Sequence, residues 1–238
     1  VTTAEELTAA LESAIAGETI KLAEGNYDVA VNIGSGVIVD GEAKANLLQG
    51  ATLADGAVLK RVTVTGAGVT GPETGRAELI QSIVKGVTGV AAVKQNMVLK
   101  TCLVYENTIG VMDSTAYLST IVANNGAGVG GNSRVYGSVI WGNVLDVEET
   151  VTLVDSYVGG NPKFTLPAPD GEDYTLLTQS PLIDLAVTAQ WEGFTNADRH
   201  VLKNDWLERF YDKGVDWVFS HKKISVVATV ATLPLCVF

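Results

Sequence analysis

Apolar and polar positions recur along the middle of the chain with a period of 18 residues. One apolar column consists of Leu103, Ile121, Val139 and Tyr157. A polar column at the same spacing consists of Asn107, Asn125, Asn143 and Asn161. Upstream, Val62 and Ile83 extend the apolar column at slightly wider spacings. Columns that stay in register over several repeats are typical of a solenoid, in which each repeat is one structural unit.

The repeating segments are short, rich in β-branched residues and separated by Gly and Asn, as in residues 97–105. They lack the i, i+3, i+4 spacing of an amphipathic helix. A repeat of this length suits one coil of three short strands, and stacked coils pair as parallel strands. The sequence therefore predicts an all-β fold, a right-handed parallel β-helix. We expect the asparagines to form a hydrogen-bonded ladder at one turn; the simpler alternative is that Asn is common in turns.

The segment 1–17 predicts a helix that caps the first coil. Thr3 and Glu6 have the spacing of a capping box, and Gly17 is a typical helix end. The apolar stripe of this helix is Leu7, Ala10, Leu11 and Ile15. We expect the coils to occupy residues 18–165 and a closing segment, packed on the coils or on a neighbour, to occupy residues 166–238.

Several stretches resemble the pectin-lyase-like β-helix proteins. Residues 14–27 read AIAGETIKLAEGNY and are similar to the cap and first coil of that family. The stretches NPKF (161–164), DYTL (173–176) and SPLID (180–184) resemble the ending of secreted bacterial β-helix surface proteins, the choice-of-anchor type. Residues 205–219 resemble a later part of that ending, with Glu208 and Trp217 in place of glycines. The resemblance implies the fold and secretion, to the medium or to the cell surface. The sequence starts at Val1 and not at Met, which either removal of a secretion signal or a shortened sequence would explain. We expect the signal sequence to have been removed.

Both faces of the repeat strands are apolar, although only one face of a solenoid strand points to the core. The family resemblance suggests that Cys102, Ser138 and Ser156 point inward. The outward face is then an apolar patch too large for a soluble monomer. We expect it to be covered by the chain beyond Asp184 or by a second subunit. This candidate covered face comprises Val62, Ile83, Leu103, Tyr105, Ile121, Val139, Trp141 and Tyr157.

The final stretch, residues 224–238, carries no charged side chain. It is too short and too rich in Thr for a membrane span, and predicts one or two extended strands. Such a strand either pairs within its own domain or is donated to a neighbouring copy by β-augmentation. The candidate donated strand comprises Ile224, Val226, Val230, Leu233, Leu235 and Phe238.

Composition narrows the range of partners. The 238 residues carry a net charge of −11, so neither nucleic acid nor an anionic membrane is an expected partner. Two cysteines, Cys102 and Cys236, are too few for a disulfide framework. The sequence leaves open whether they form a single disulfide bridge.

No constellation of catalytic residues stands out. The acids of the coils are scattered over different turns, whereas a glycoside hydrolase needs paired carboxylates. The bases Lys85, Lys100 and Arg134 do not share a column with them, and His200 and His221 lack metal-ligand spacing. The acids concerned are Glu106, Asp113, Asp146, Glu148, Glu149 and Asp155. We therefore expect no catalytic residue, metal or cofactor.

The sequence favours a non-catalytic secreted or cell-surface protein with a structural, adhesive or self-assembling role. Its expected partners are further copies of itself or a polysaccharide. Two alternatives remain: a carbohydrate-active enzyme, either a polysaccharide lyase or a glycoside hydrolase, and a fibre domain like those of phage tail spikes.

Overall fold

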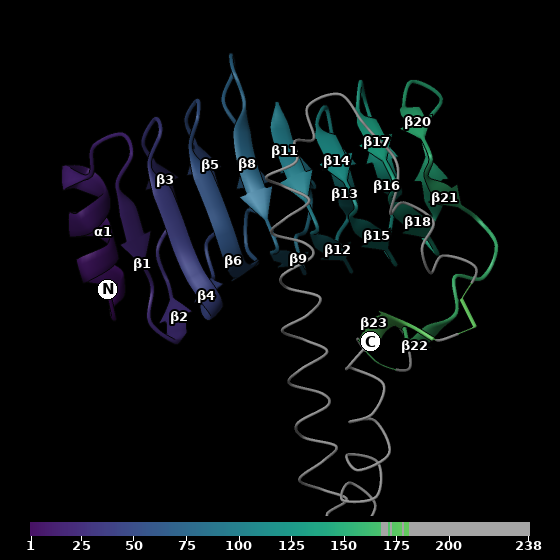
Figure 1. The fold of residues 1–238 in the computed structure, drawn as a ribbon, viewed down its shortest axis with the longest axis horizontal. Coiled ribbons are helices and arrows are strands. Elements are labelled where there is room, and N and C mark those ends of the chain that lie inside the picture. The colour runs from purple at the N-terminus through teal and green to yellow at the C-terminus, as the bar shows by residue number, and fades with distance from the viewer. Residues whose placement is uncertain (168–170, 172, 178, 181–238) are drawn as a thin grey trace, which may run out of the picture. The chain divides into compact units, whose positions relative to one another are not determined.

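The computed structural model describes residues 1–167, 171, 173–177 and 179–180. Within these residues the chain is a right-handed parallel β-helix of about seven turns, with one helix at its N-terminus (Figure 1). This confirms the predicted fold class. The predicted donated strand, residues 224–238, and the expected cover beyond Asp184 lie outside the described residues.

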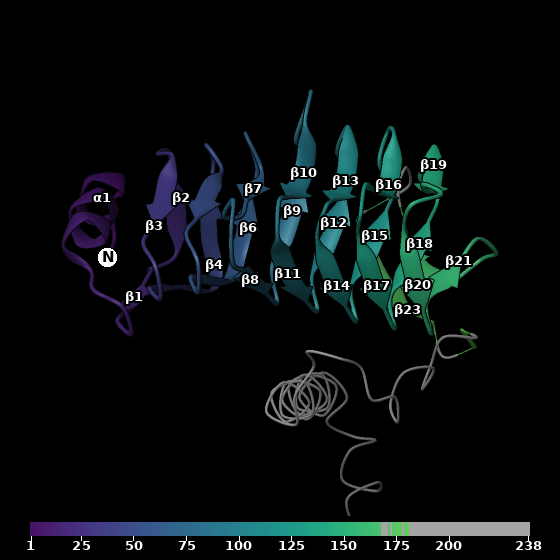
Figure 2. The same ribbon diagram turned by 90° about the horizontal axis from the view of Figure 1, so that it is seen from above.

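The coils build three walls of parallel strands (Figures 1 and 2). We call them walls A, B and C. The strands β4 (Ile38–Leu47) and β6 (Val58–Val64) each bend at a corner, so that their first halves belong to wall A and their second halves to wall B. The other strands of wall A are β1 (Thr19–Lys21), β8 (Ala77–Ile80), β11 (Met97–Lys100), β14 (Thr115–Tyr117), β17 (Arg134–Tyr136) and β20 (Thr152–Val154). Those of wall B are β2 (Gly25–Tyr27), β9 (Ile83–Lys85), β12 (Leu103–Tyr105), β15 (Thr120–Val122), β18 (Val139–Trp141) and β21 (Tyr157–Val158). Wall C consists of β3 (Val31–Ile33), β5 (Ala51–Leu53), β7 (Val69–Thr70), β10 (Ala91–Lys94), β13 (Ile109–Met112), β16 (Ala127–Gly130) and β19 (Leu145–Val147).

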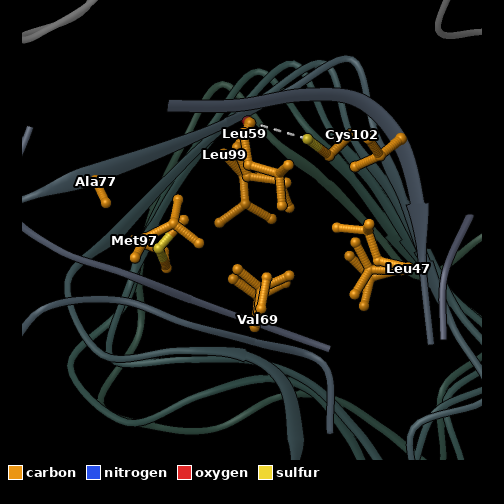
Figure 3. Packing of buried hydrophobic residues seen from close by; sticks show 14 of the residues in the cluster. Leu47, Leu59, Val69, Ala77, Met97, Leu99 and Cys102 are labelled. Atoms are coloured by element: carbon orange, nitrogen blue, oxygen red, sulfur yellow. Dashed lines mark hydrogen bonds between the residues drawn. The ribbon is translucent and has the colours of Figure 1, made fainter. Parts of the chain in front are cut away.

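Each wall sends a column of aliphatic side chains into the centre, where they meet (Figure 3). In wall A, strand pairing aligns Leu59 with Leu79 and Leu99, and all three are fully buried. Leu47 from wall B and Val69 from wall C close the same core from the other sides. Burial of one such side chain stabilises the fold by roughly 1.5–3 kcal/mol.

The N-terminal cap is α1 (Ala4–Ser13). Its N-cap Thr3 accepts the Glu6 N–H, and Leu7 is fully buried on the core. The Glu6 carboxylate reaches Thr2 instead of Thr3, so the capping box is displaced by one residue. The helix ends before Ile15, which is 68% exposed, and the predicted stripe therefore runs past the end of the helix.

The predicted fixed register is wrong at one coil. Strand pairing aligns Leu103 with Thr120 and Thr120 with Val139, so a coil shorter than the predicted period is followed by a longer one. Ile121 consequently points into the core beside Val104, and it is fully buried. The longer coil makes up for the shorter one, so the average period is unchanged. A search with a fixed period therefore does not detect the shift.

The same shift moves the asparagine ladder. The Asn107 side-chain amide donates to Asn124 Oδ1 (2.9 Å), and the Asn124 amide donates to Asn143 Oδ1 (2.7 Å). Asn143 in turn donates to the Asp146 carboxylate (3.0 Å), which ends the ladder. The predicted members Asn125 and Asn161 are not in it: Asn125 is exposed, and the Asn161 side chain accepts the Lys163 N–H.

A second ladder runs along the corner between walls A and B. The Ser119 hydroxyl donates to the Tyr117 carbonyl (2.9 Å) and accepts the Cys102 N–H (3.1 Å). Ser138 repeats this pattern by accepting the Ser119 N–H (3.0 Å). Cys102 is a free, buried cysteine whose thiol donates to the Leu79 carbonyl (3.2 Å). These groups satisfy buried backbone at a sharp bend of each coil.

The outward apolar face of wall B is covered by a hairpin of β22 (Phe164–Leu166) and β23 (Asp173–Leu176). Its Tyr174 lies against Tyr105, with ring centroids 5.2 Å apart, and its Phe164 lies against Trp141 at 5.8 Å. Ile83, Leu103 and Val139 pack on this cluster. The stretches NPKF and DYTL thus supply a cover, ahead of the segment from which the sequence analysis expected it.

Two members of the predicted covered face lie elsewhere. Val62 is 3% exposed and belongs to the core, as does Ile121. Thr63, not Val62, pairs with Ile83, so the upstream column was displaced by one residue. Tyr157 follows Val139 in the outward column.

We predict that Asn124→Ala lowers the free energy of unfolding by about 2–4 kcal/mol, because it leaves buried amide and backbone groups without partners. The matched change Asn125→Ala, at an exposed side chain, is expected to cost less than about 0.5 kcal/mol. Urea titrations of both variants measure the difference. Equal effects would contradict the observed ladder.

Burial raises the pKa of the Cys102 thiol from 9.0 to about 12. An unfolded chain ionises this thiol at a pH of about 8.5, so its contribution to stability is intact below that pH and is lost as pH rises toward about 12. In a Cys236→Ser background, Cys102→Ser is expected to keep the fold. It should also abolish the part of the stability loss at high pH that comes from ionisation of the Cys102 thiol. The stability advantage of the parent over the variant should fall as pH rises through that window, by up to about 1.4 kcal/mol per pH unit. Parallel curves for the two proteins would contradict the prediction.

Candidate functional site

A polar groove of about 240 Å³ lies along the corner between walls C and A. Strand pairing places four residues of its rim, one from each of four successive coils, just before the strands of wall A: Arg76, Asn96, Asp113 and Asn132. Its floor includes the outward-facing Val98 and Thr115, and Arg134 stands next to them in the same column. The groove thus runs parallel to the solenoid axis.

The length of the groove follows from the spacing of the coils. Arg76 precedes β8 and Arg134 begins β17, and these strands are separated by β11 and β14. Three strand spacings of about 4.7–4.9 Å give a separation of about 14 Å along the axis. The groove therefore suits an extended ligand better than a compact one.

The two guanidinium groups have no carboxylate partner among the described residues. Arg76 and Arg134 are both exposed, and within the described chain neither side chain forms an ion pair or a hydrogen bond. Asp113 is the one carboxylate among the residues that line the groove. Its Oδ1 accepts the Asn132 N–H (2.9 Å), which holds the turn. The lining thus carries more positive than negative charge, on a chain whose net charge is −11.

The amides of the groove differ in what they offer a ligand. The Asn96 side chain donates to the carbonyls of Pro72 and Glu73, so its oxygen is left as an acceptor. Asn132 is exposed, and its side chain makes no hydrogen bond to the described residues. Guanidinium, amide and hydroxyl groups are the groups that bind carboxylate and hydroxyl oxygens.

Several acids that the sequence analysis found scattered over different turns stabilise those turns. Glu148 accepts the Gly131 N–H (2.9 Å), as Asp55 accepts that of Arg76 (2.8 Å). Asp113 and Asp146 do the same at their own turns. Each carboxylate thereby accepts a backbone N–H at a turn that the strand pairing leaves without a partner. These acids therefore have a structural role.

A buried ion-pair cluster lies in the N-terminal coils. Asp40 is 3% exposed and accepts from Arg61 Nη2 (2.6 Å) and Nε (2.9 Å), with Lys60 Nζ at 3.3 Å. Burial on its own would raise the pKa of Asp40, but the bonds from Arg61 and from the Glu42 N–H hold it below its usual value. The Asp40 carboxylate is therefore ionised and bound by two cations. Because Lys60 and Arg61 belong to the next coil, these ion pairs link neighbouring coils.

No group of three or more His, Cys, Asp or Glu residues able to hold a metal ion occurs among the described residues. The described part of the chain also has no helix long and apolar enough to cross a membrane.

The sequence analysis missed Arg76, Asn96 and Asn132 as site residues. It named Arg134 and Asp113 but placed them apart, whereas the structure brings both into one groove. The four rim residues follow one another at unequal steps along the sequence, the same unequal steps that the strands of wall A follow. A search that allowed coils of unequal length would have aligned this polar column.

No family model matches the chain, and no curated protein matches it. Two solved β-helix structures are similar to it in part. One is pectate lyase Pel9A, with 19% identity and a TM-score of 0.41 over 66% of this chain and 65% of that chain. The other is the A-module of mannuronan C-5 epimerase AlgE4 from Azotobacter vinelandii, with 13% identity and a TM-score of 0.39 over 66% of this chain and 77% of that chain. This chain thus aligns with less than two thirds of the lyase, and such a likeness says nothing of its own substrate or reaction.

Proposed function

We propose that this protein is a non-catalytic, secreted or cell-surface β-helix with an adhesive or structural role, and that its groove binds an extended anionic polysaccharide. The observation that carries the proposal is the pair of guanidinium groups, Arg76 and Arg134, that find no partner in the described chain and lie in one polar groove along the solenoid axis. The resemblance of its closing stretches to secreted bacterial β-helix surface proteins supports the location.

The groove geometry favours a linear polymer that carries carboxylates at intervals. The two arginines come from coils about 14 Å apart along the axis, so an extended ligand that follows the groove meets one after the other. Between them lie Thr115 and the exposed amides of Asn96 and Asn132, which suit the hydroxyls of sugar rings. The chain as a whole is acidic and repels a polyanion, so binding depends on local cations such as those of the groove.

The chemistry favours binding over turnover. Glycoside hydrolysis uses two carboxyl groups about 5–9.5 Å apart, and the residues lining the groove include one, Asp113. That carboxylate already accepts a backbone N–H. We therefore assign to the groove a holding role.

A carbohydrate-active enzyme is the second candidate, because a carboxylate and two arginines do share the groove. Incubation with polygalacturonate or alginate, followed by ultraviolet absorbance of unsaturated uronates and by reducing-end assays, addresses this directly. Turnover that disappears in Asp113→Asn would replace the binding proposal with an enzymatic one.

Binding to polygalacturonate and alginate is expected to weaken about 3- to 10-fold in Arg76→Ala and in Arg134→Ala, and further in the double variant. Calorimetry or an immobilised-polymer assay measures this. Because the contacts are exposed, affinity should also fall as salt rises from about 50 to about 500 mM.

Lys44→Ala is the matched control, since Lys44 is an exposed cation at the bend of β4, outside the groove. It is expected to leave affinity unchanged. Equal losses in the lysine and arginine variants would mean that binding follows net charge, and would remove the groove from the proposal.

A further inference from the structure

The core of the solenoid is left open at the C-terminal end of the described coils. In wall A, Val135 is fully buried, but Leu153, its partner on the last coil, is 40% exposed. In wall B, Ile140 is fully buried and its partner Val158 is 40% exposed. Leu145 on wall C is 50% exposed. Among the described residues, no further coil covers these side chains as it covers their equivalents earlier in the stack.

The backbone is also open at this end. Within the described chain, β19, β20 and β21 are the terminal strands of their walls, each paired with a neighbour on one side (Figures 1 and 2). The opposite end of the solenoid is covered by α1 through Leu7. Unpaired strand edges beside exposed aliphatic side chains are a template for an added strand.

Negative charge surrounds the open end. The last coil carries Asp146, Glu148, Glu149 and Asp155, and no Lys or Arg occurs between Arg134 and Lys163. Glu149, just before β20, is exposed and its side chain makes no hydrogen bond or ion pair with the described residues. A partner strand for this edge should therefore be uncharged and apolar, with a basic flank.

One segment of the sequence has this character. Residues 224–238 carry no charge, and Lys222 and Lys223 stand directly before them. Ile224, Val226, Ala228 and Val230 alternate along it as a strand with one apolar face would.

We propose that the open end binds residues 221–238 of a second copy of this chain as an added parallel strand along β20. In that direction Lys222 and Lys223 come beside Glu148 and Glu149, which precede β20, while the alternate aliphatic residues cover Leu153. Direct contact between two open ends would bring their acidic rims together, and stacking on α1 offers no strand edge. The choice of a second copy rests on the proposed structural role, since donated strands link copies into an open chain.

Cysteine trapping in the full chain tests the proposal. In a Cys236→Ser background, one copy carries Leu153→Cys and a differently tagged copy carries Val226→Cys. After mild oxidation of the mixture we expect a covalent heterodimer. The control replaces Leu153→Cys with Ile15→Cys, because Ile15 is also an exposed aliphatic residue but lies just after α1, at the N-terminal end of the solenoid. It should give no cross-link with Val226→Cys.

Three outcomes would overturn the proposal. A third variant carries Leu153→Cys and Val226→Cys in the same chain; a disulfide that forms only within this chain, without heterodimer in the mixture, would show that the strand stays in its own copy. Cross-links between two Leu153→Cys copies, without heterodimer, would show contact of open ends. No cross-link of any kind would show that the segment does not bind there.

Charge reversal gives a second readout that leaves the groove untouched. Light scattering over a range of concentrations should show association of the parent protein, weakened about tenfold in Lys222→Glu/Lys223→Glu. Adding Glu149→Lys should restore it, whereas Glu24→Lys, an exposed acid near the first coil, should not. A parent protein that stays monomeric throughout would overturn the proposal, while polysaccharide affinity tests the groove separately.

Discussion

The structure depends on one constraint: each coil must place its aliphatic side chains directly over those of the coil before it. Parallel strand pairing fixes the spacing of the coils along the axis, and the inward columns of the three walls then form one continuous core. A slip of one residue would turn Leu99 or Val104 outward and expose the core.

The polar ladders make this constraint compatible with coils of unequal length. A shorter coil bends at different points from a longer one, and its turns leave backbone groups that strand pairing does not satisfy. Asn107, Asn124 and Asn143 at one turn, and the hydroxyls of Ser119 and Ser138 at another, take up those groups. Carboxylates such as Asp113 and Glu148 serve the third corner. These acids are therefore best understood as part of the framework of the protein.

Candidate binding sites arise where the stacked coils align exposed side chains or strand edges that are not needed for packing or for hydrogen bonds within the fold. The outward apolar residues of wall B are covered by the β22–β23 hairpin, so this face is part of the fold. Among the described residues, the groove between walls C and A keeps two guanidinium groups without partners, and the last coil keeps an open core and open strand edges. The groove supports a proposed site for an anionic polymer and the open end a proposed site for another copy. The two involve different residues of the solenoid and can be tested separately.

The sequence by itself determined the β-helix, the N-terminal cap, and the wall B face that needs cover, because these depend on patterns that repeat or on local capping. It could not determine the register of the 103–120 coil. Asn124 and Asn125 are adjacent, as are Thr120 and Ile121, and a fixed period selects the wrong member of each pair; only pairing in three dimensions decides which side chain faces inward. A fixed period also failed to reveal the groove, since Arg76 and Arg134 are far apart along the chain and the unequal coils between them place both on one surface. Tertiary structure also revealed the open end, because exposure of Leu153 depends on what stacks above its coil and not on any property of its own segment.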